Sequence, residues 1–297
     1  MNQWLISPEE LHNLNASDAT IFDCRFSLTD HNMGRNLYLE GHIPNACFLD
    51  MEVDLSGDKA LHGGRHPLPE PEAFALKMRQ CGINQNSLII AYDNNRMAGA
   101  ARLWWLLKLF GHTRVKILDG GLAAWKNTGL AITTQPSITT MGNFEATISS
   151  SLIVDRYWIR QHLIDEHITL IDSREAPRYL GLTEPIDPFA GHIPGAINSP
   201  WQHVTNSEGQ IKSPELQRQI WQALPMTKNP VVYCGSGVSA CVNLLSLSVA
   251  GIDNGRLYAG SWSDWCSYPE YPLEPPATQQ PIAQKTEPLK KSSKNNP

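Results

Sequence analysis

The feature that most constrains this chain is an internal repeat. Three motifs occur twice, in the same order: IFDCR and LIDSR, GHIPNACFLD and GHIPGAINSP, and LDGGLAAW and YAGSWSDW. Self-similarity at a long, fixed spacing is the signature of a duplicated structural unit. The repeated unit is about 130 residues long, which is the size of an ordinary domain. The sequence therefore predicts two related domains in tandem.

The apolar pattern within each copy predicts the fold class. SLIIAYD (87–93) and PVVYC (230–234) are continuous apolar runs, as expected of strands that are buried on both faces. Each run leads into a helical pattern that ends at a glycine, over residues 98–111 and 239–251. Strands that alternate with helices predict an α/β fold, in which each domain has a mainly parallel sheet flanked by helices.

Composition indicates where the domains begin and end. The segment 131–150 is rich in Thr and Ser and interrupts the alternating pattern, so we interpret it as a linker. From residue 275 onward large apolar side chains are almost absent, which predicts a disordered tail over 275–297. We therefore expect an N-terminal domain in residues 1–130 and a C-terminal domain in residues 151–274.

Charge and hydropathy argue against some classes of binding partner. The net charge of −5 argues against nucleic acid as the main partner. No apolar run approaches the roughly 20 residues that span a membrane. The first residues, MNQWLISPEE, have neither the basic flank nor the apolar segment of a secretion signal. We expect a cytoplasmic monomer that binds neither nucleic acid nor membranes.

Six cysteines are scattered along the chain, and no two have the Cys-x-x-Cys spacing of a zinc site or a dithiol redox motif. Without a secretion signal, disulfides are not expected. The sequence therefore predicts free thiols and neither a bound metal nor a cofactor. The six are Cys24, Cys47, Cys81, Cys234, Cys241 and Cys266.

Cys234 is placed differently from the other five. It ends a predicted buried strand and is followed at once by Gly235, Ser236 and Gly237. Ligands of parallel sheets bind beyond the carboxyl ends of the strands. A glycine-rich turn that opens a helix can point successive N–H groups inward as a cradle for an anion. A cysteine there is expected to react as a thiolate near neutral pH, whereas the other five are interpreted as small buried apolar residues.

Two chemistries suit a thiolate in an anion cradle. Cysteine-dependent phosphatases need an arginine six positions after the cysteine to grip the phosphate oxygens. That position is Ala240 here, and the loop contains no basic residue. Attack on sulfur needs no such arginine, because the cysteine takes a sulfane sulfur from a donor and holds it as a persulfide. The loop therefore favours sulfur transfer over phosphate chemistry.

These motifs together resemble the two-domain rhodanese superfamily, over nearly the whole stretch from Trp4 to about Glu274. The loop CGSGVSA is most similar to the 3-mercaptopyruvate sulfurtransferase branch, whose pattern is Cys-Gly-Ser-Gly-Val-Thr/Ser. The resemblance implies transfer of sulfur from 3-mercaptopyruvate, through a persulfide on Cys234, to cyanide, a small thiol or thioredoxin. It also implies substrate contacts from the loop residues Gly235, Gly237, Val238 and Ser239.

Two alternatives to this interpretation stay open at the level of sequence. The first is an enzyme on the same scaffold that prefers thiosulfate. The second is a non-catalytic sulfur carrier or binding module, because a carrier would keep the cysteine as well.

The N-terminal copy is expected to be catalytically silent. The stretch around Asp93 aligns with the stretch around Cys234, with Tyr92 opposite Tyr233. Asp93 then stands where the second copy has its cysteine, and a carboxylate cannot carry a persulfide. The silent domain is instead expected to form one wall of the cleft over Cys234.

The resemblance also implies catalytic side chains from that wall. In the resembled branch an acid and a histidine of the N-terminal domain approach the cysteine, and the loop serine completes a relay. His66 matches this histidine through the Pro-Leu-Pro that follows it, and Ser236 matches the serine. Asp54 and Glu52 are both candidates for the acid, and Asp54 is preferred. Arg65 adds positive potential beside His66.

Arg178 lies six residues after Asp172 and matches the substrate-binding arginine of the resembled family. A guanidinium suits that role, since mercaptopyruvate carries a carboxylate that it can bind in a bidentate way. Animal enzymes of the branch have a second arginine further along, whereas TEPIDPFAGHIPG (183–195) contains none. An ordinary loop histidine at His66 and a surface ion pair at Arg178 are the plainer alternatives.

Polar residues that recur in both copies, including the silent one, are better explained by the fold than by the chemistry. We therefore interpret two Asp–Arg pairs and the histidines of the GHIP motifs as scaffold, and the tryptophans of the helices as core. They are Asp23 with Arg25, Asp172 with Arg174, His42, His192, Trp104, Trp105, Trp125 and Trp265.

Overall fold

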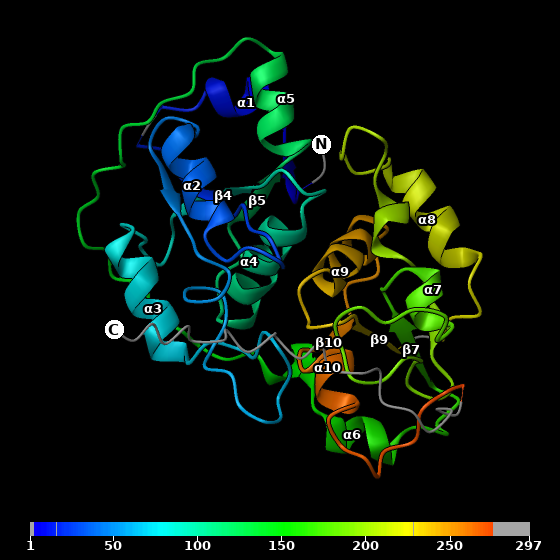
Figure 1. Ribbon diagram of the computed structural model, residues 1–297. Coiled ribbons are helices and arrows are strands. Elements are labelled where there is room, and N and C mark those ends of the chain that lie inside the picture. The colour runs from blue at the N-terminus through cyan, green and yellow to red at the C-terminus, as the bar shows by residue number, and fades with distance from the viewer. Residues whose placement is uncertain (1–2, 16, 228, 276–297) are drawn as a thin grey trace, which may run out of the picture.

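The computed structural model of the chain describes residues 3–15, 17–227 and 229–275. It contains two five-stranded sheets, one in each half of the chain, and helices flank both (Figure 1). All strand pairs within the two sheets are parallel, so the predicted fold class is confirmed. The expected disordered tail lies outside the described residues, apart from Pro275. Among the described residues, no helix combines the length and apolar character that crossing a membrane requires.

The sheet of the N-terminal domain has the strand order β1-β5-β4-β2-β3. Its strands are β1 (Leu5–Ile6), β2 (Ala19–Asp23), β3 (Ala46–Phe48), β4 (Leu88–Tyr92) and β5 (Val115–Leu118). The helices of this domain are α1 (Pro8–His12), α2 (Met33–Glu40), α3 (Pro71–Gln80), α4 (Ala98–Leu109) and α5 (Gly121–Asn127).

The sheet of the C-terminal domain has the order β6-β10-β9-β7-β8, which is the same topology. Its strands are β6 (Ile153–Val154), β7 (Ile168–Asp172), β8 (Ile197–Asn198), β9 (Asn229–Tyr233) and β10 (Arg256–Tyr258). Its helices are α6 (Arg156–Gln161), α7 (Ala176–Tyr179), α8 (Pro214–Gln222), α9 (Ala240–Val249) and α10 (Ser261–Trp265), with short 3-10 turns at Ser150–Leu152 and Trp201–Val204.

The duplication extends to buried polar contacts. Each Asp–Arg pair closes an ion pair of 2.6 Å, and each arginine also donates to the carbonyl of the glycine that opens the GHIP motif. Both pairs are buried, so the motif fixes the end of a central strand to the following turn. The scaffold interpretation of these pairs is confirmed. They are Asp23 and Arg25 with Gly41, and Asp172 and Arg174 with Gly191.

The segment between the two sheets contains no helix or strand from residue 131 to residue 149, apart from a single bridge. It runs back along the N-terminal domain and is fixed to it by backbone hydrogen bonds. Thr133 pairs with His42, the N–H of Phe144 donates to Ile83, and the N–H of Thr147 donates to Phe110. The connection is therefore held on one domain.

Helices α4 and α9 pack against each other where the two domains meet (Figure 1). One buried apolar cluster contains side chains from both helices, among them Leu103, Leu106, Val242 and Leu245. Domains that share an apolar core are held in one arrangement, in contrast to domains joined by a small polar interface. This packing sets the start of α9, and the loop before it, against the N-terminal domain.

Candidate active site

Cys234 follows β9 directly, at the carboxyl end of a central strand, and is 2% exposed. The N–H of Gly237 donates to its Sγ at 3.1 Å, and its own N–H donates to Ser261 Oγ at 3.2 Å. Gly237 has a φ of +78°, and a Cβ there would lie 2.3 Å from the carbonyl oxygen of Ala259. Only glycine fits this turn, which aims its N–H at the sulfur.

The first copy contains a related loop, in which backbone N–H groups surround a carboxylate. The carboxylate of Asp93 follows β4 and accepts four backbone N–H groups at 2.7 to 3.1 Å. Burial raises the pKa of Asp93, and the four donors act in the opposite direction. The loop of the first copy thus binds the chain's own carboxylate at the position that Cys234 has in the second copy. The donors belong to Asn95, Met97, Gly99 and Ala100.

A cavity of about 110 Å³ lies over Cys234, and both domains line it. Ser236 and three other predicted loop residues, Gly235, Val238 and Ser239, are at its wall, whereas Gly237 faces the sulfur through its N–H. Its small volume suits a donor of a few heavy atoms. The remaining lining residues are Phe26, Leu28, Arg65, Asn95, Ala98, Arg174, Glu175, Arg178 and Trp201.

His66 connects the two domains at the cysteine loop. It is 3% exposed, its Nδ1 lies 2.7 Å from Ser236 Oγ, and its Nε2 lies 2.8 Å from Glu52 Oε1. An ionised carboxylate can only accept, so Nε2 carries the hydrogen and Nδ1 accepts from the serine hydroxyl. Glu52, His66 and Ser236 therefore form a continuous chain along which a proton can move.

The preference for Asp54 as the acid is wrong. Its carboxylate accepts the backbone N–H of Asp50 at 2.8 Å and pairs with Lys77 at 3.0 Å. Residues 50–54 form a turn that closes on itself, because the N–H of Asp54 also donates to the carbonyl of Asp50. This turn directs Asp54 back onto its own backbone and leaves Glu52 to reach His66.

Burial lowers the pKa of His66 to about 4, although the neighbouring Glu52 carboxylate acts to raise it. An unfolded histidine titrates near 6.5. Between about pH 6.5 and pH 4 the unfolded state therefore binds the extra proton, and stability falls as the pH falls. That shift corresponds to about 3 kcal/mol.

As the pH falls through this range, the free energy of unfolding should decrease less in His66→Asn than in the wild type. The difference between the two decreases should be about 3 kcal/mol. Urea unfolding of both proteins at a series of pH values measures the difference. Parallel stability curves for the two proteins would contradict a neutral, buried His66.

Two guanidinium groups reach the cysteine loop. The Nε and Nη2 of Arg178 bind Glu184, and its Nη2 also binds Asp187 at 3.1 Å. Arg65 pairs with Asp187 from the opposite domain. A Cβ on Gly235 would lie 2.8 Å from Arg65 Nη2 and 3.5 Å from Arg178 Nη1, so both cations lie against the loop.

Sequence reasoning placed Arg178 at the site but gave little weight to Arg65. It missed Phe26 and Leu28, which reach the cavity from the other domain, and Trp201, which no motif marks. Arg174 both pairs with Asp172, as its scaffold interpretation requires, and lines the cavity.

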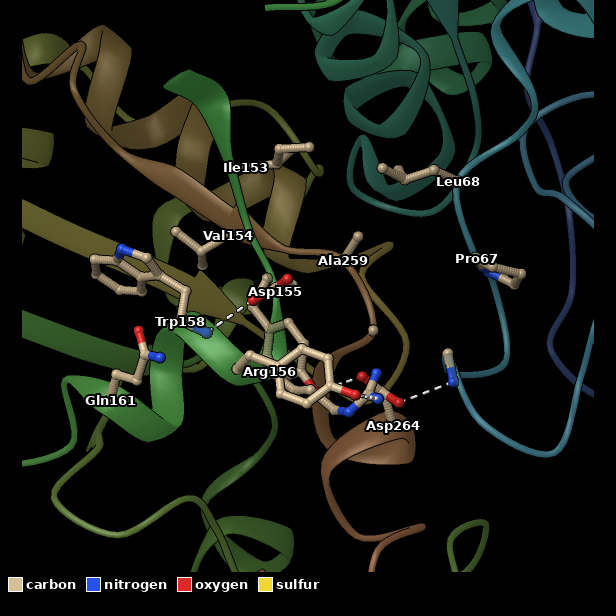
Figure 2. Close-up of a pocket in the computed structure, with 14 residues that line it drawn as sticks. Pro67, Leu68, Ile153, Val154, Asp155, Arg156, Trp158, Gln161, Ala259 and Asp264 are labelled. Atoms are coloured by element: carbon tan, nitrogen blue, oxygen red, sulfur yellow. Dashed lines mark hydrogen bonds between the residues drawn. The ribbon is translucent and has the colours of Figure 1, made fainter. Parts of the chain in front are cut away.

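The loop that carries Arg65 and His66 is fastened to the C-terminal domain. The N–H of Gly63 donates to Asp264 Oδ1 at 2.8 Å, which Figure 2 shows as a dashed line, and the N–H of Arg65 donates to Ser263 Oγ at 3.1 Å. Both acceptors lie on α10, near the Ser261 that binds Cys234. The same helix therefore supports the cysteine and the loop that faces it.

A larger hollow of about 670 Å³ lies elsewhere along the domain interface (Figure 2). It is lined by Leu68 and Pro67 from one domain and by Val154, Trp158 and Ala259 from the other. No cysteine and none of the predicted site residues line it. The smaller cavity is the candidate active site, because it combines the nucleophile, the cradle and the cations.

The structure also bears on bound metals. All six cysteines are free. Within the described part of the chain, no group of three or more His, Cys, Asp or Glu side chains is arranged to hold a metal ion.

Duplicated parallel sheets with a cysteine in an N–H cradle define the rhodanese class of protein. The sequence model of the rhodanese-like domain matches residues 7–128 and 155–268. The chain belongs to this family.

Individual relatives narrow the comparison. The chain is 43% identical over 277 residues to a Pseudomonas aeruginosa protein named "Probable 3-mercaptopyruvate sulfurtransferase", covering 91% of this chain and 97% of the relative. It is 34% identical to the 3-mercaptopyruvate sulfurtransferase of Escherichia coli K12, over 92% and 98% of the two chains. The crystal structure of SseA from Escherichia coli superimposes with a TM-score of 0.77 at 32% identity, over 88% of this chain and 99% of that one.

Proposed function

We propose that this chain is a 3-mercaptopyruvate sulfurtransferase that moves sulfur through a persulfide on Cys234. The observation that carries the proposal is the joint geometry at one small cavity. A buried cysteine accepts a cradle N–H, and a proton-transfer chain and two guanidinium groups meet the same loop. The relatives of that name, at 43% and 34% identity, support the same activity.

In the first half-reaction, the carboxylate of mercaptopyruvate binds Arg178 and Arg65. The thiolate of Cys234 attacks the donor sulfur, so the S–S bond forms as the C–S bond breaks. The electron pair of the C–S bond leaves on carbon as the enolate of pyruvate. His66 takes the thiol proton through Ser236 and returns it to that carbon, which yields pyruvate and a cysteine persulfide anion.

In the second half-reaction, an acceptor attacks the outer sulfur of the persulfide and Cys234 leaves as a thiolate. Cyanide, a small thiol or thioredoxin has the nucleophile that this step requires. The cradle N–H groups stabilise the anionic cysteine before and after the transfer.

The N-terminal domain, residues 1–130, is proposed to be silent in chemistry and to supply Glu52, His66 and Arg65 to the other domain. Residues 131–150 are the proposed linker, and residues 151–274 carry the reacting cysteine. The cytoplasmic location, the monomeric state and the absence of nucleic-acid and membrane partners stay predictions from the sequence.

A thiosulfate-preferring enzyme is the second candidate. The chain is 34% identical to the bovine protein named thiosulfate sulfurtransferase, over 78% of this chain and 79% of that one. Two cations beside the cysteine loop also suit an anionic donor. A carrier without turnover is the third candidate, because it would need only the cysteine.

Incubation with 3-mercaptopyruvate in the absence of an acceptor is expected to add the mass of one sulfur atom to the protein. Peptide mapping should place that sulfur on Cys234, because its sulfur accepts the N–H of Gly237 and none of the other five cysteines lines the cavity. Addition of cyanide should remove the sulfur and permit repeated turnover. Sulfur found mainly on Cys241 or Cys266 would contradict the assignment, and a single turnover would favour the carrier.

A further inference from the structure

Arg102 lies in the middle of α4 and is fully buried. Its guanidinium donates to four backbone carbonyls and also contacts the thiol of Cys241. Its Nη1 binds the oxygen of Gly237 at 3.1 Å, and its Nη2 binds Leu55 at 3.2 Å, His66 at 3.1 Å and Pro67 at 3.3 Å. Among the described residues, no carboxylate lies within ion-pair distance of Arg102.

The other arginines at the domain centres and at the cavity have acidic partners. Arg174 pairs with Asp172 and Glu184, and Arg178 and Arg65 bind Glu184 or Asp187. A buried cation without a counter-charge is costly, unless another anion compensates it. The charge of Arg102 is therefore available to an anion that forms nearby.

The carbonyls that Arg102 binds belong to His66 of the proposed proton chain and to residues close to its other two members. Leu55 follows the turn that carries Glu52, His66 is the base, and Gly237 belongs to the cysteine loop. One guanidinium thus holds the relay and the cysteine loop together across the domain interface.

The bond to Gly237 also bears on the cradle. Its carbonyl belongs to the same peptide group as the N–H of Val238, and donation to the oxygen strengthens that N–H as a donor. In the silent copy, the N–H at the corresponding position is that of Met97, and it binds the carboxylate of Asp93 at 3.1 Å. The peptide that Arg102 polarises is therefore the one whose counterpart holds an anion.

We propose that Arg102 is a positioning residue that supplies the unpaired positive charge balancing anionic sulfur at Cys234. The part that concerns the persulfide rests on the proposed function, whereas the part that concerns the resting thiolate does not. Several other groups face Cys234 or line its cavity, and the cations among them are paired with acids. They are Arg65, Arg174, Arg178 and Glu175 at the cavity, His66 behind Ser236, and Cys241 on α9.

The test is the pH profile of Cys234 alkylation by iodoacetamide, followed on the Cys234 peptide. In Arg102→Met, the midpoint of the profile should move to higher pH, and the rate below it should fall about tenfold. Arg102→Lys keeps the charge and should stay near the wild type. Lys108→Met is the matched control, because Lys108 is a partly buried cation of the same helix that packs on Trp4 and Trp104.

An unchanged profile in folded Arg102→Met would overturn the proposal. If that variant does not fold, Arg102→Gln replaces it, since glutamine keeps hydrogen-bond donors without the charge. If the midpoint of the alkylation profile then moved equally in Arg102→Gln and Arg102→Lys, the charge of Arg102 would not be the cause and the proposal would be overturned. Alkylation needs no sulfur donor, so this result stands whether or not mercaptopyruvate is the substrate.

Discussion

Replacing Cys234 by serine is expected to abolish sulfur transfer, with kcat falling by on the order of 10⁴-fold or more. A serine hydroxyl stays protonated at neutral pH and cannot carry sulfur as a persulfide. The side chain is nearly isosteric, and the position is buried in a short turn, so the variant should fold. Steady-state assays with mercaptopyruvate and cyanide, together with intact mass after donor treatment, measure both consequences.

The matched control for this variant is Cys241→Ser. Cys241 lies in the first turn of α9, and its thiol donates to the carbonyl of Gly237 at 3.4 Å. Burial raises the pKa of Cys241 to about 12, so it stays a thiol under assay conditions. Serine should replace it with little effect on turnover. Full activity in folded Cys234→Ser, or its loss in Cys241→Ser, would reverse the assignment of the nucleophile.

The features that sequence predicted well are local or repeated. The apolar runs at β4 and β9 specify buried parallel strands without reference to the rest of the chain. The glycine-rich turn after Cys234 specifies its own backbone geometry, because Gly237 needs a positive φ. Such signals are contained in a few consecutive residues, and the repeat provides the strand signal twice.

The features that sequence missed depend on contacts between distant segments. Spacing alone could not separate Glu52 from Asp54, because a turn decides which of the two faces His66. Arg65 gains its importance from the approach of Gly235, which lies in the other domain. In the sequence, Arg102 is one charged residue in an apolar helical pattern. The carbonyl groups that it binds come from distant segments, so only the packed structure identifies them.

Both copies have a loop of backbone N–H groups after a central strand, but different side chains occupy it. In the first copy, the loop after β4 binds the carboxylate of Asp93 through four backbone N–H groups. In the second, the same turn holds Cys234, whose sulfur can accept and release a second sulfur atom. The domain that has Asp93 in place of a cysteine packs against the other domain. It places Glu52, His66 and Arg65 beside the cysteine loop.

Donor choice follows from this arrangement. Thiosulfate is a dianion that gives up sulfur without a proton transfer, whereas mercaptopyruvate must lose a thiol proton and gain one on carbon. The chain from Ser236 through His66 to Glu52 serves only the second requirement. The residues directly after the cysteine, Gly235 and Ser236, carry no charge that would favour the dianion. We therefore expect a higher kcat/KM for 3-mercaptopyruvate than for thiosulfate.

Ser236→Ala separates the two donors. It breaks the proton chain at its first member, so kcat/KM for mercaptopyruvate should fall on the order of 10²-fold, the usual contribution of a general acid–base group. The same change should leave thiosulfate turnover nearly unaltered, because no proton moves in that reaction. Ser239→Ala is the control, since Ser239 lines the same cavity without touching His66. Equal losses with both donors would refute the proton-transfer role of Ser236, and a wild type that prefers thiosulfate would reassign the donor while leaving sulfur transfer through Cys234 in place.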